Sequence, residues 1–157
     1  MIAIASLAAL MMGMQDQPDK ASISLRVGIV GGIVAPRVRH SIDIVAEKDA
    51  VTVKMMKLKD GKPVVTTGTM TRKEFDALLK EIDAAWKLPV EDPRGCEDIY
   101  GLDTGVAVKS GERSWSNGAP GGCNHGTSKV QPTAAERETF KKIVERVVRE
   151  GEARATK

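Results

Sequence analysis

The sequence predicts an α+β protein with a single antiparallel sheet of about five to six strands and two helices packed on one face of it. Apolar residues alternate with polar residues in several segments that tight turns connect, which is typical of half-buried antiparallel strands. Two further segments carry apolar residues at helical spacing. Helices with one apolar stripe each need the apolar face of a sheet to cover. The expected order along the chain is ββββαββα.

Residues 22–30 predict the first strand, because every second position is apolar: Ile23, Leu25, Val27 and Ile29. Gly31 and Gly32 follow as a turn or bulge. Residues 37–46 alternate again and predict the second strand. His40 falls on the apolar face of this strand, where a hydrogen-bonded core histidine is the expectation.

The third and fourth strands are expected to form a hairpin. The apolar positions of the third strand change parity, with Val51, Val53 and Met55 followed by Met56 and Leu58. A β-bulge near Met55–Met56 would restore the alternation. Asp60-Gly61 indicates a two-residue turn, because glycine accepts a positive φ without a Cβ clash. Residues 62–70 form the returning strand and are rich in threonine.

Each helix is expected behind a threonine that has a glutamate three positions later, the spacing of a capping box. The first helix follows Thr71 and stops at Pro89. Its apolar stripe consists of Phe75, Leu78, Leu79, Ile82 and Trp86. The second helix follows Thr133, and Gly151 can terminate it. Its stripe consists of Phe140, Ile143, Val144, Val147 and Val148.

Two more strands and two loops are expected between the helices. Residues 89–98 read as a loop, and the alternation in residues 100–108 predicts the fifth strand. Residues 112–117 return as a short sixth strand. Residues 118–132 form a Gly-rich loop before the last helix. Asp98 is expected to cap a turn at the entrance to the fifth strand.

The N-terminus indicates export. Residues 1–12 are an apolar run whose length falls within the roughly 7–15 residues of a signal-peptide core and below the about 20 residues of a membrane span. We expect a signal peptide and linker at 1–20, one α+β domain at 21–151 and a frayed tail at 152–157. The mature protein would then be periplasmic or secreted, without a membrane span. An ordinary buried first strand or helix is the alternative for the apolar run.

Cys96 and Cys123 are the only cysteines. In an oxidising compartment they would pair, and closing that loop would stabilise the fold by about 3–4 kcal/mol. In the cytosol they would be two free thiols. Export and an even cysteine count together predict a Cys96–Cys123 disulfide.

Composition argues against a nucleic-acid partner. The 157 residues carry a net charge of +3, from 24 basic and 21 acidic residues, and aromatic residues make up 3%. Nucleic-acid binders concentrate basic residues in one footprint and offer aromatic rings for stacking. Here the basic residues are spread over expected strands and a helix face.

Few residue patterns suggest catalysis or metal binding. Cys123 and His125 could supply a nucleophile and a base, but residues two apart in one loop seldom converge as catalytic pairs do. Zinc could use Cys96, Cys123, His125 and His40, although only one pair is closely spaced. The acidic cluster of Glu91, Asp92, Glu97, Asp98 and Asp103 lacks a calcium-loop pattern. We expect no catalytic residue, no metal and no cofactor.

The remaining features favour binding to a protein partner. Turn and edge residues displayed on a disulfide-fixed sheet are suited to holding a partner. The candidates for partner binding are Gly31, Gly32, Arg37, Trp115, Asn117 and His125. Addition of a strand to a sheet edge is a second mode of binding. The alternative is that these loops only connect the strands.

Several of these segments resemble one group of proteins. The residues that carry the resemblance are Gly31-Gly32 after a strand, the F-x-x-L-L helix at Phe75–Leu79, the Gly95–Tyr100 run before a strand, and the helix at 133–150. Over residues 22–150 the layout resembles the emfourin-type inhibitors of thermolysin-like metallopeptidases and their exported relatives. The resemblance implies peptidase inhibition. The cysteine pair and Ile33–Pro36 depart from that group's pattern.

The sequence therefore predicts a small exported binding protein without catalytic activity, and peptidase inhibition is the most concrete hypothesis. A structural or assembly protein of the cell envelope is one alternative. A small thiol-dependent enzyme or metal-binding protein that uses Cys123 and His125 is another.

Overall fold

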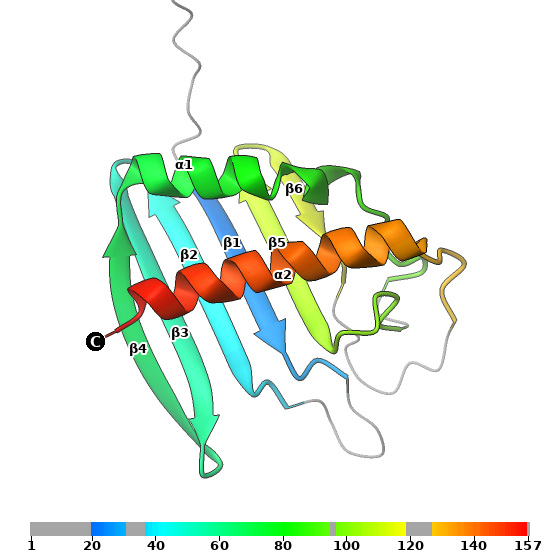
Figure 1. The fold of residues 1–157 in the computed structure, drawn as a ribbon, viewed down its shortest axis with the longest axis horizontal. Helices are drawn as coiled ribbons and strands as arrows, with labels where there is room; N and C mark the ends of the chain where they lie inside the picture. The colour runs from blue at the N-terminus through cyan, green and yellow to red at the C-terminus, as the bar shows by residue number, and fades with distance from the viewer. Residues whose placement is uncertain (1–19, 31–36, 95–96, 119–126, 157) are drawn as a thin grey trace, which may run out of the picture.

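A computed structural model describes residues 20–30, 37–94, 97–118 and 127–156. These residues form one six-stranded antiparallel sheet and two α-helices (Figure 1), so the predicted fold class and element order are confirmed. The elements are β1 Lys20–Val27, β2 His40–Glu47, β3 Ala50–Lys59, β4 Lys62–Met70, α1 Arg72–Glu81, the 3₁₀ helix η1 Asp83–Lys87, β5 Thr104–Ser110, β6 Arg113–Ser116 and α2 Ala134–Arg154. No helix in these ranges is long and apolar enough to cross a membrane.

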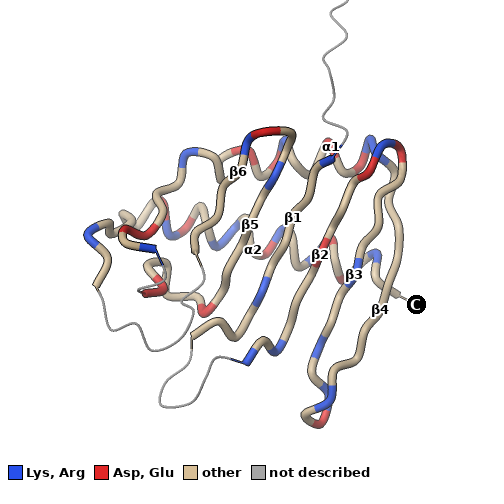
Figure 2. The backbone as a smooth tube through the Cα atoms, turned by 180° about the vertical axis from the view of Figure 1, so that it is seen from behind, with Lys and Arg blue, Asp and Glu red and all other residues tan. Residues whose placement is uncertain are grey.

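Both helices cover the same face of the sheet (Figure 1). The strands lie in the order β4-β3-β2-β1-β5-β6, so the hairpin of β5 and β6 returns to pair beside β1. The alternation in the sequence places the apolar side of each strand under the helices. The fully buried side chains include Ile23, Leu25, Ile42, Ile44, Val53, Phe75, Leu78, Val108, Phe140 and Val147. Within the described ranges no helix covers the opposite face, which Figure 2 shows.

The predicted bulge in β3 is wrong. β3 pairs residue for residue with β2 from Ala50 to Lys57 and with β4 from Val51 to Lys59. Met55 pairs with Ile42 on the helix-covered face, and Met56 pairs with Ser41 on the open face. The parity changes because the β3–β4 hairpin reaches beyond the helices (Figure 1), where neither face is fully buried. Apolar side chains can then occupy either face.

The capping boxes at Thr71 and Thr133 are both present, but both helix ends differ from expectation. α1 ends at Glu81, and the chain continues as η1 towards Pro89. α2 passes through Gly151 to Arg154, and Ala155 is 4% exposed. A Cβ at Gly151 would lie 2.6 Å from Ile42 Cδ1, so this glycine permits close contact between helix and sheet and does not cap the helix.

Residues 152–156 are consequently not a frayed tail. Gly68 of β4 packs against the carbonyl of Arg154, which a Cβ at Gly68 would approach to 1.9 Å. The end of α2 is therefore fixed on β4. Lys157 lies outside the described residues.

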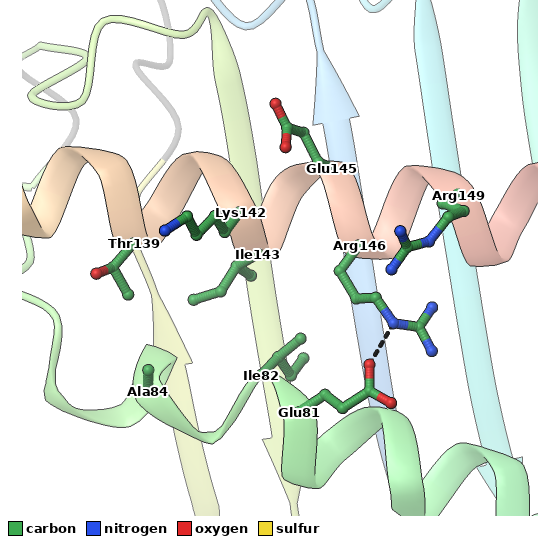
Figure 3. Close-up of a pocket in the computed structure, with 9 residues that line it drawn as sticks. All are labelled: Glu81, Ile82, Ala84, Thr139, Lys142, Ile143, Glu145, Arg146 and Arg149. Atoms are coloured by element: carbon green, nitrogen blue, oxygen red, sulfur yellow. Dashed lines mark hydrogen bonds and ion pairs between the residues drawn. The ribbon is translucent and has the colours of Figure 1, made fainter.

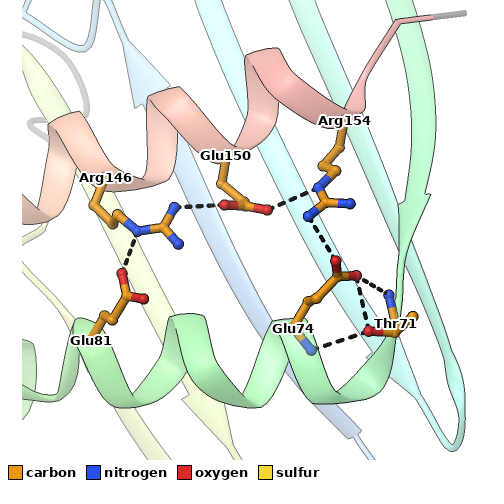
Figure 4. A network of polar contacts seen from close by, with 6 residues as sticks. All are labelled: Thr71, Glu74, Glu81, Arg146, Glu150 and Arg154. Atoms are coloured by element: carbon orange, nitrogen blue, oxygen red, sulfur yellow. Dashed lines mark hydrogen bonds and ion pairs between the residues drawn. The ribbon is translucent and has the colours of Figure 1, made fainter.

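Five side chains join the two helices (Figure 4). Arg146 donates to Glu81 on α1 and, at 2.6 Å, to Glu150 on its own helix. Arg154 donates to Glu150 at 3.0 Å and to Glu74 of the α1 capping box at 2.9 Å. Burial raises the pKa of Glu150, but the hydrogen bonds from both arginines outweigh it, so this pKa lies below its ordinary value.

Candidate functional site

One end of the sheet collects the segments that carry most of the predicted site residues. At this end β1 stops, β2 and β5 start and β6 stops, because Val27 pairs with both His40 and Thr104, and Ser116 pairs with Ala107. We call it the loop end. Three segments begin or end there: 28–39, 88–103 and 117–133.

Asp103 holds both ends of the 28–39 segment. Its Oδ1 accepts a hydrogen bond from the backbone N–H of Val30 at 2.7 Å. Its Oδ2 accepts from Arg39 Nη2, also at 2.7 Å, and its carbonyl accepts from the N–H of Gly28 at 2.9 Å. The side chain of Asp103 is 30% exposed, so this anchor lies at the border between core and solvent.

Asp98 in turn shapes the backbone that carries Asp103. Its Oδ2 accepts from the N–H of Asp103 at 2.6 Å. Its Oδ1 accepts from the N–H groups of Tyr100 and Gly101 at 3.3 and 3.1 Å. This is the turn that the sequence predicted for Asp98, and it delays the start of β5 to Thr104.

Tyr100 fixes the same segment to the core. Its ring stacks on Phe140 with centroids 4.1 Å apart, and its hydroxyl donates to the carbonyl of Pro89 at 2.6 Å. Burial raises the pKa of the Tyr100 phenol, so the hydroxyl keeps the proton that it donates.

Glu91 connects the other two segments. It is 1% exposed, and its Oε2 accepts from the N–H of Glu97 at 3.1 Å. Gly118 packs directly on it, since a Cβ at Gly118 would lie 2.0 Å from Oε1, and Gly118 has a φ of +89°. Buried glutamates are rare unless they are paired, which marks Glu91 as a structural anchor.

A second contact joins the same two segments beside Glu91. The N–H of Asp92 donates to Ser128 Oγ at 3.1 Å, and the N–H of Lys129 donates to the carbonyl of Asp92 at 2.8 Å. Gln131 Nε2 donates to Glu97 Oε1 at 2.6 Å. The bases of all three segments are thus tied to one another.

Two predicted partner-binding residues are buried and have structural roles. Trp115 is 7% exposed, and its Nε1 donates to the carbonyl of Leu88 at 3.0 Å. Asn117 is 4% exposed. Its Oδ1 accepts from the N–H of Val106 at 2.7 Å, and its Nδ2 donates to the carbonyl of Thr104 at 2.9 Å. The Asn117 amide therefore continues the β5–β6 ladder, and neither side chain is a contact surface.

Arg37 remains on the surface at the loop end, where its Nη2 donates to the carbonyl of Gly61 at 2.7 Å. Gly31, Gly32 and His125 lie outside the described residues, as do Cys96 and Cys123 with the predicted disulfide.

Within the described ranges no group of three His, Cys, Asp or Glu side chains is placed to hold a metal ion, and Cys96, Cys123 and His125 lie outside these ranges. The acidic cluster instead supplies backbone anchors. The prediction of a hydrogen-bonded core histidine at position 40 is wrong. His40 is half-buried, and its Nε2 is buried without a hydrogen-bond partner among the described residues. Burial and Lys57 lower its pKa, and Glu152 raises it by less.

A cleft lies between the two helices. Its volume is about 400 Å³, and Figure 3 shows the side chains that line it. Ile82, Ala84 and Ile143 line it together with charged side chains. Arg146 reaches across it to Glu81, so one of the ion pairs that join the two helices crosses the cleft.

Comparison of the chain with protein families, with curated proteins and with solved structures finds no match. The resemblance to emfourin-type inhibitors stays a prediction.

Proposed function

We propose that this chain is a small, non-catalytic binding protein that presents the loop end to a protein partner in the cell envelope or outside the cell. Inhibition of a secreted or periplasmic peptidase is the most concrete form of the proposal. The observation that carries it is the set of carboxylate anchors formed by Glu91, Asp98 and Asp103.

These anchors favour binding because they hold the bases of three segments in fixed positions. Binding surfaces built on a rigid scaffold lose less conformational entropy on association than free loops do. A loop that serves only as a connection needs no buried carboxylate at its base, and burying one is costly unless its oxygens are hydrogen-bonded.

Charge at the loop end indicates which partners suit it. Arg37, Arg94 and Lys129 are exposed, whereas Arg39 is neutralised by Asp103. Arg26 lies on the open face of the sheet, paired with Asp43 at 2.7 Å. A partner with acidic residues around its contact surface would be attracted to the three exposed cations.

Titration of secreted metallo- and serine peptidases with the purified protein tests the inhibitor form of the proposal. We expect stoichiometric inhibition of a susceptible peptidase, and no digestion of the inhibitor. Arg37→Ala should weaken inhibition by about tenfold or more, the effect of removing a hot-spot arginine. Arg113→Ala is the matched control, because Arg113 starts β6 at the opposite end of the sheet and lies over Trp86.

If micromolar protein affects no peptidase of the panel, the inhibitor form fails. Co-purification of a stable envelope partner would then favour the structural or assembly alternative. Retention of any detected activity in Cys123→Ser would exclude the thiol-enzyme alternative. Intact-mass spectrometry of protein from its native cells, with and without reductant, tests export and the Cys96–Cys123 disulfide.

A further inference from the structure

The free edge of β4 has the properties of a pairing surface. β4 is the outermost strand, and among the described strands it pairs with β3 alone. Asp60 and Gly61 have φ values of 50° and 74°, which identifies a type I′ two-residue turn. The residues that flank such a turn, Lys59 and Lys62, form a hydrogen-bonded pair.

This pairing decides which backbone groups of β4 face outward. Hydrogen-bonded and non-hydrogen-bonded pairs alternate along an antiparallel ladder. The even-numbered residues of β4 therefore bond to β3, and the odd-numbered ones turn their N–H and C=O groups to the free edge. The outward N–H donors belong to Val65, Thr67 and Thr69, since Pro63 has none.

This edge lacks the devices that usually prevent strand pairing. Exposed edges are commonly blunted by charged side chains, by proline or by short length. β6, the opposite edge, has four residues, whereas β4 has nine. β4 carries no charge from Pro63 to Met70, and Val64 and Val65 are 46% and 49% exposed. Only Lys62 and Pro63, at the start of β4, act against pairing with another strand.

We propose that β4 pairs with β4 of a second copy of this chain, antiparallel, around a two-fold axis at Thr66. Val65 then faces Thr67 of the other copy, and Pro63 faces Thr69. These contacts form about six hydrogen bonds between the copies and leave no outward N–H of Val65, Thr67 or Thr69 unpaired. The two sheets become one continuous sheet, with the helices of both copies on the same face.

Side-chain size and charge favour a second copy as the occupant. Val64 faces Gly68 of the other copy, where the carbonyl of Arg154 takes the place of a side chain, so the exposed valine meets backbone there and no bulky side chain. The residues at the end of α2 cross β4 at Gly68 on the helix-covered face, and in this register the two crossings lie on opposite sides of the axis. The hairpin tips, which carry Lys59 and Lys62, point in opposite directions, so their charges do not meet.

Sedimentation velocity of the full chain, from micromolar to submillimolar concentration, tests the proposal. An interface of this kind is small, so we expect a reversible monomer–dimer equilibrium. Thr67→Pro removes an outward N–H without removing a bond to β3, and should abolish the dimer while circular dichroism stays unchanged. Thr67→Val keeps that N–H and is the matched control that should still dimerise. Val65→Lys should also give monomers, and it tests the edge if the proline variant fails to fold.

Cross-linking tests the register. Residue 66 faces its own copy across the axis in a non-hydrogen-bonded pair, the geometry in which a disulfide fits. Thr66→Cys should yield a linkage between the two position-66 residues in peptide mapping after mild oxidation. Thr69→Cys, which lies away from the axis, should not link to itself.

Several results would overturn the proposal. They are a monomer at every concentration, a dimer that neither Thr67→Pro nor Val65→Lys disrupts, and self-linkage of Thr69→Cys in preference to Thr66→Cys. A chain that stays monomeric but loses a different protein partner upon Thr67→Pro would assign the edge to that partner and also overturn it.

Discussion

Replacing Asn117 with alanine tests whether this residue is a structural part of the sheet or a surface contact. The substitution leaves the N–H of Val106 and the carbonyl of Thr104 without their partners, in residues that are 1% and 3% exposed. A buried polar group without a partner costs about 1–3 kcal/mol. Because there are two such groups and water can reach part of the gap, we expect a loss of about 2–4 kcal/mol in the free energy of unfolding.

Urea unfolding followed by circular dichroism measures this loss. A destabilisation of that size should lower Tm by roughly 4–16 °C in a chain of this length. Ser114→Ala is the control, because Ser114 is exposed on β6, the strand that Asn117 follows, and its effect should stay within about 0.5 kcal/mol. Asn117→Asp should be rescued in part by acid, since a protonated carboxyl regains a donor for Thr104. If Asn117→Ala lowers the free energy of unfolding by less than about 0.5 kcal/mol, the amide does not stabilise the β5–β6 ladder and the reasoning is refuted.

Three further predictions use the same assays. Gly151→Ala should destabilise the protein by about 1–3 kcal/mol in urea unfolding, because its Cβ would overlap Ile42. Glu150 should stabilise the protein at neutral pH, and this contribution should be lost as the pH falls below the ordinary glutamate range, because its folded-state pKa is depressed. Glu150→Gln should make the stability of the protein depend less on pH in this acid range. Asp103→Ala should weaken partner binding clearly but lower Tm only a little, because the hydrogen bonds that it removes at the bases of the segments are partly exposed. Inhibition titration and thermal unfolding of the same variant check this.

The fold could be predicted because its signals are local. A strand with one buried face alternates at period two, and each capping box is a contact between residues three positions apart. Tight turns then leave little freedom in how the strands pair. Even the turn at Asp98 followed from one acidic side chain beside the start of a strand.

The errors came from positions whose role depends on distant contacts. A glycine near the end of a helix has the same sequence signature whether it caps the helix or admits a neighbour, and only Ile42 shows that Gly151 does the second. Asn117 follows a strand like any turn residue, and its buried ladder role depends on β5, eleven positions earlier in the chain. Glu91 stands among loop residues and carries no local signal of burial.

The two proposed surfaces meet only at the Asp60–Gly61 turn, where Arg37 donates to the carbonyl of Gly61, so a substitution farther along β4 separates their tests. β4 is the strand farthest from β5 and β6 in the sheet order. Pairing two antiparallel β4 strands reverses the second sheet, so the loop ends of the two copies face in opposite directions. The two loop ends of a dimer then cannot bind the same surface of one partner molecule, so the dimer gains no avidity for a single target molecule. Val65→Lys should therefore become monomeric and still inhibit or bind with full affinity per chain. A loss of binding in that variant would mean that β4 is part of the partner surface, and the separation argued here would be wrong.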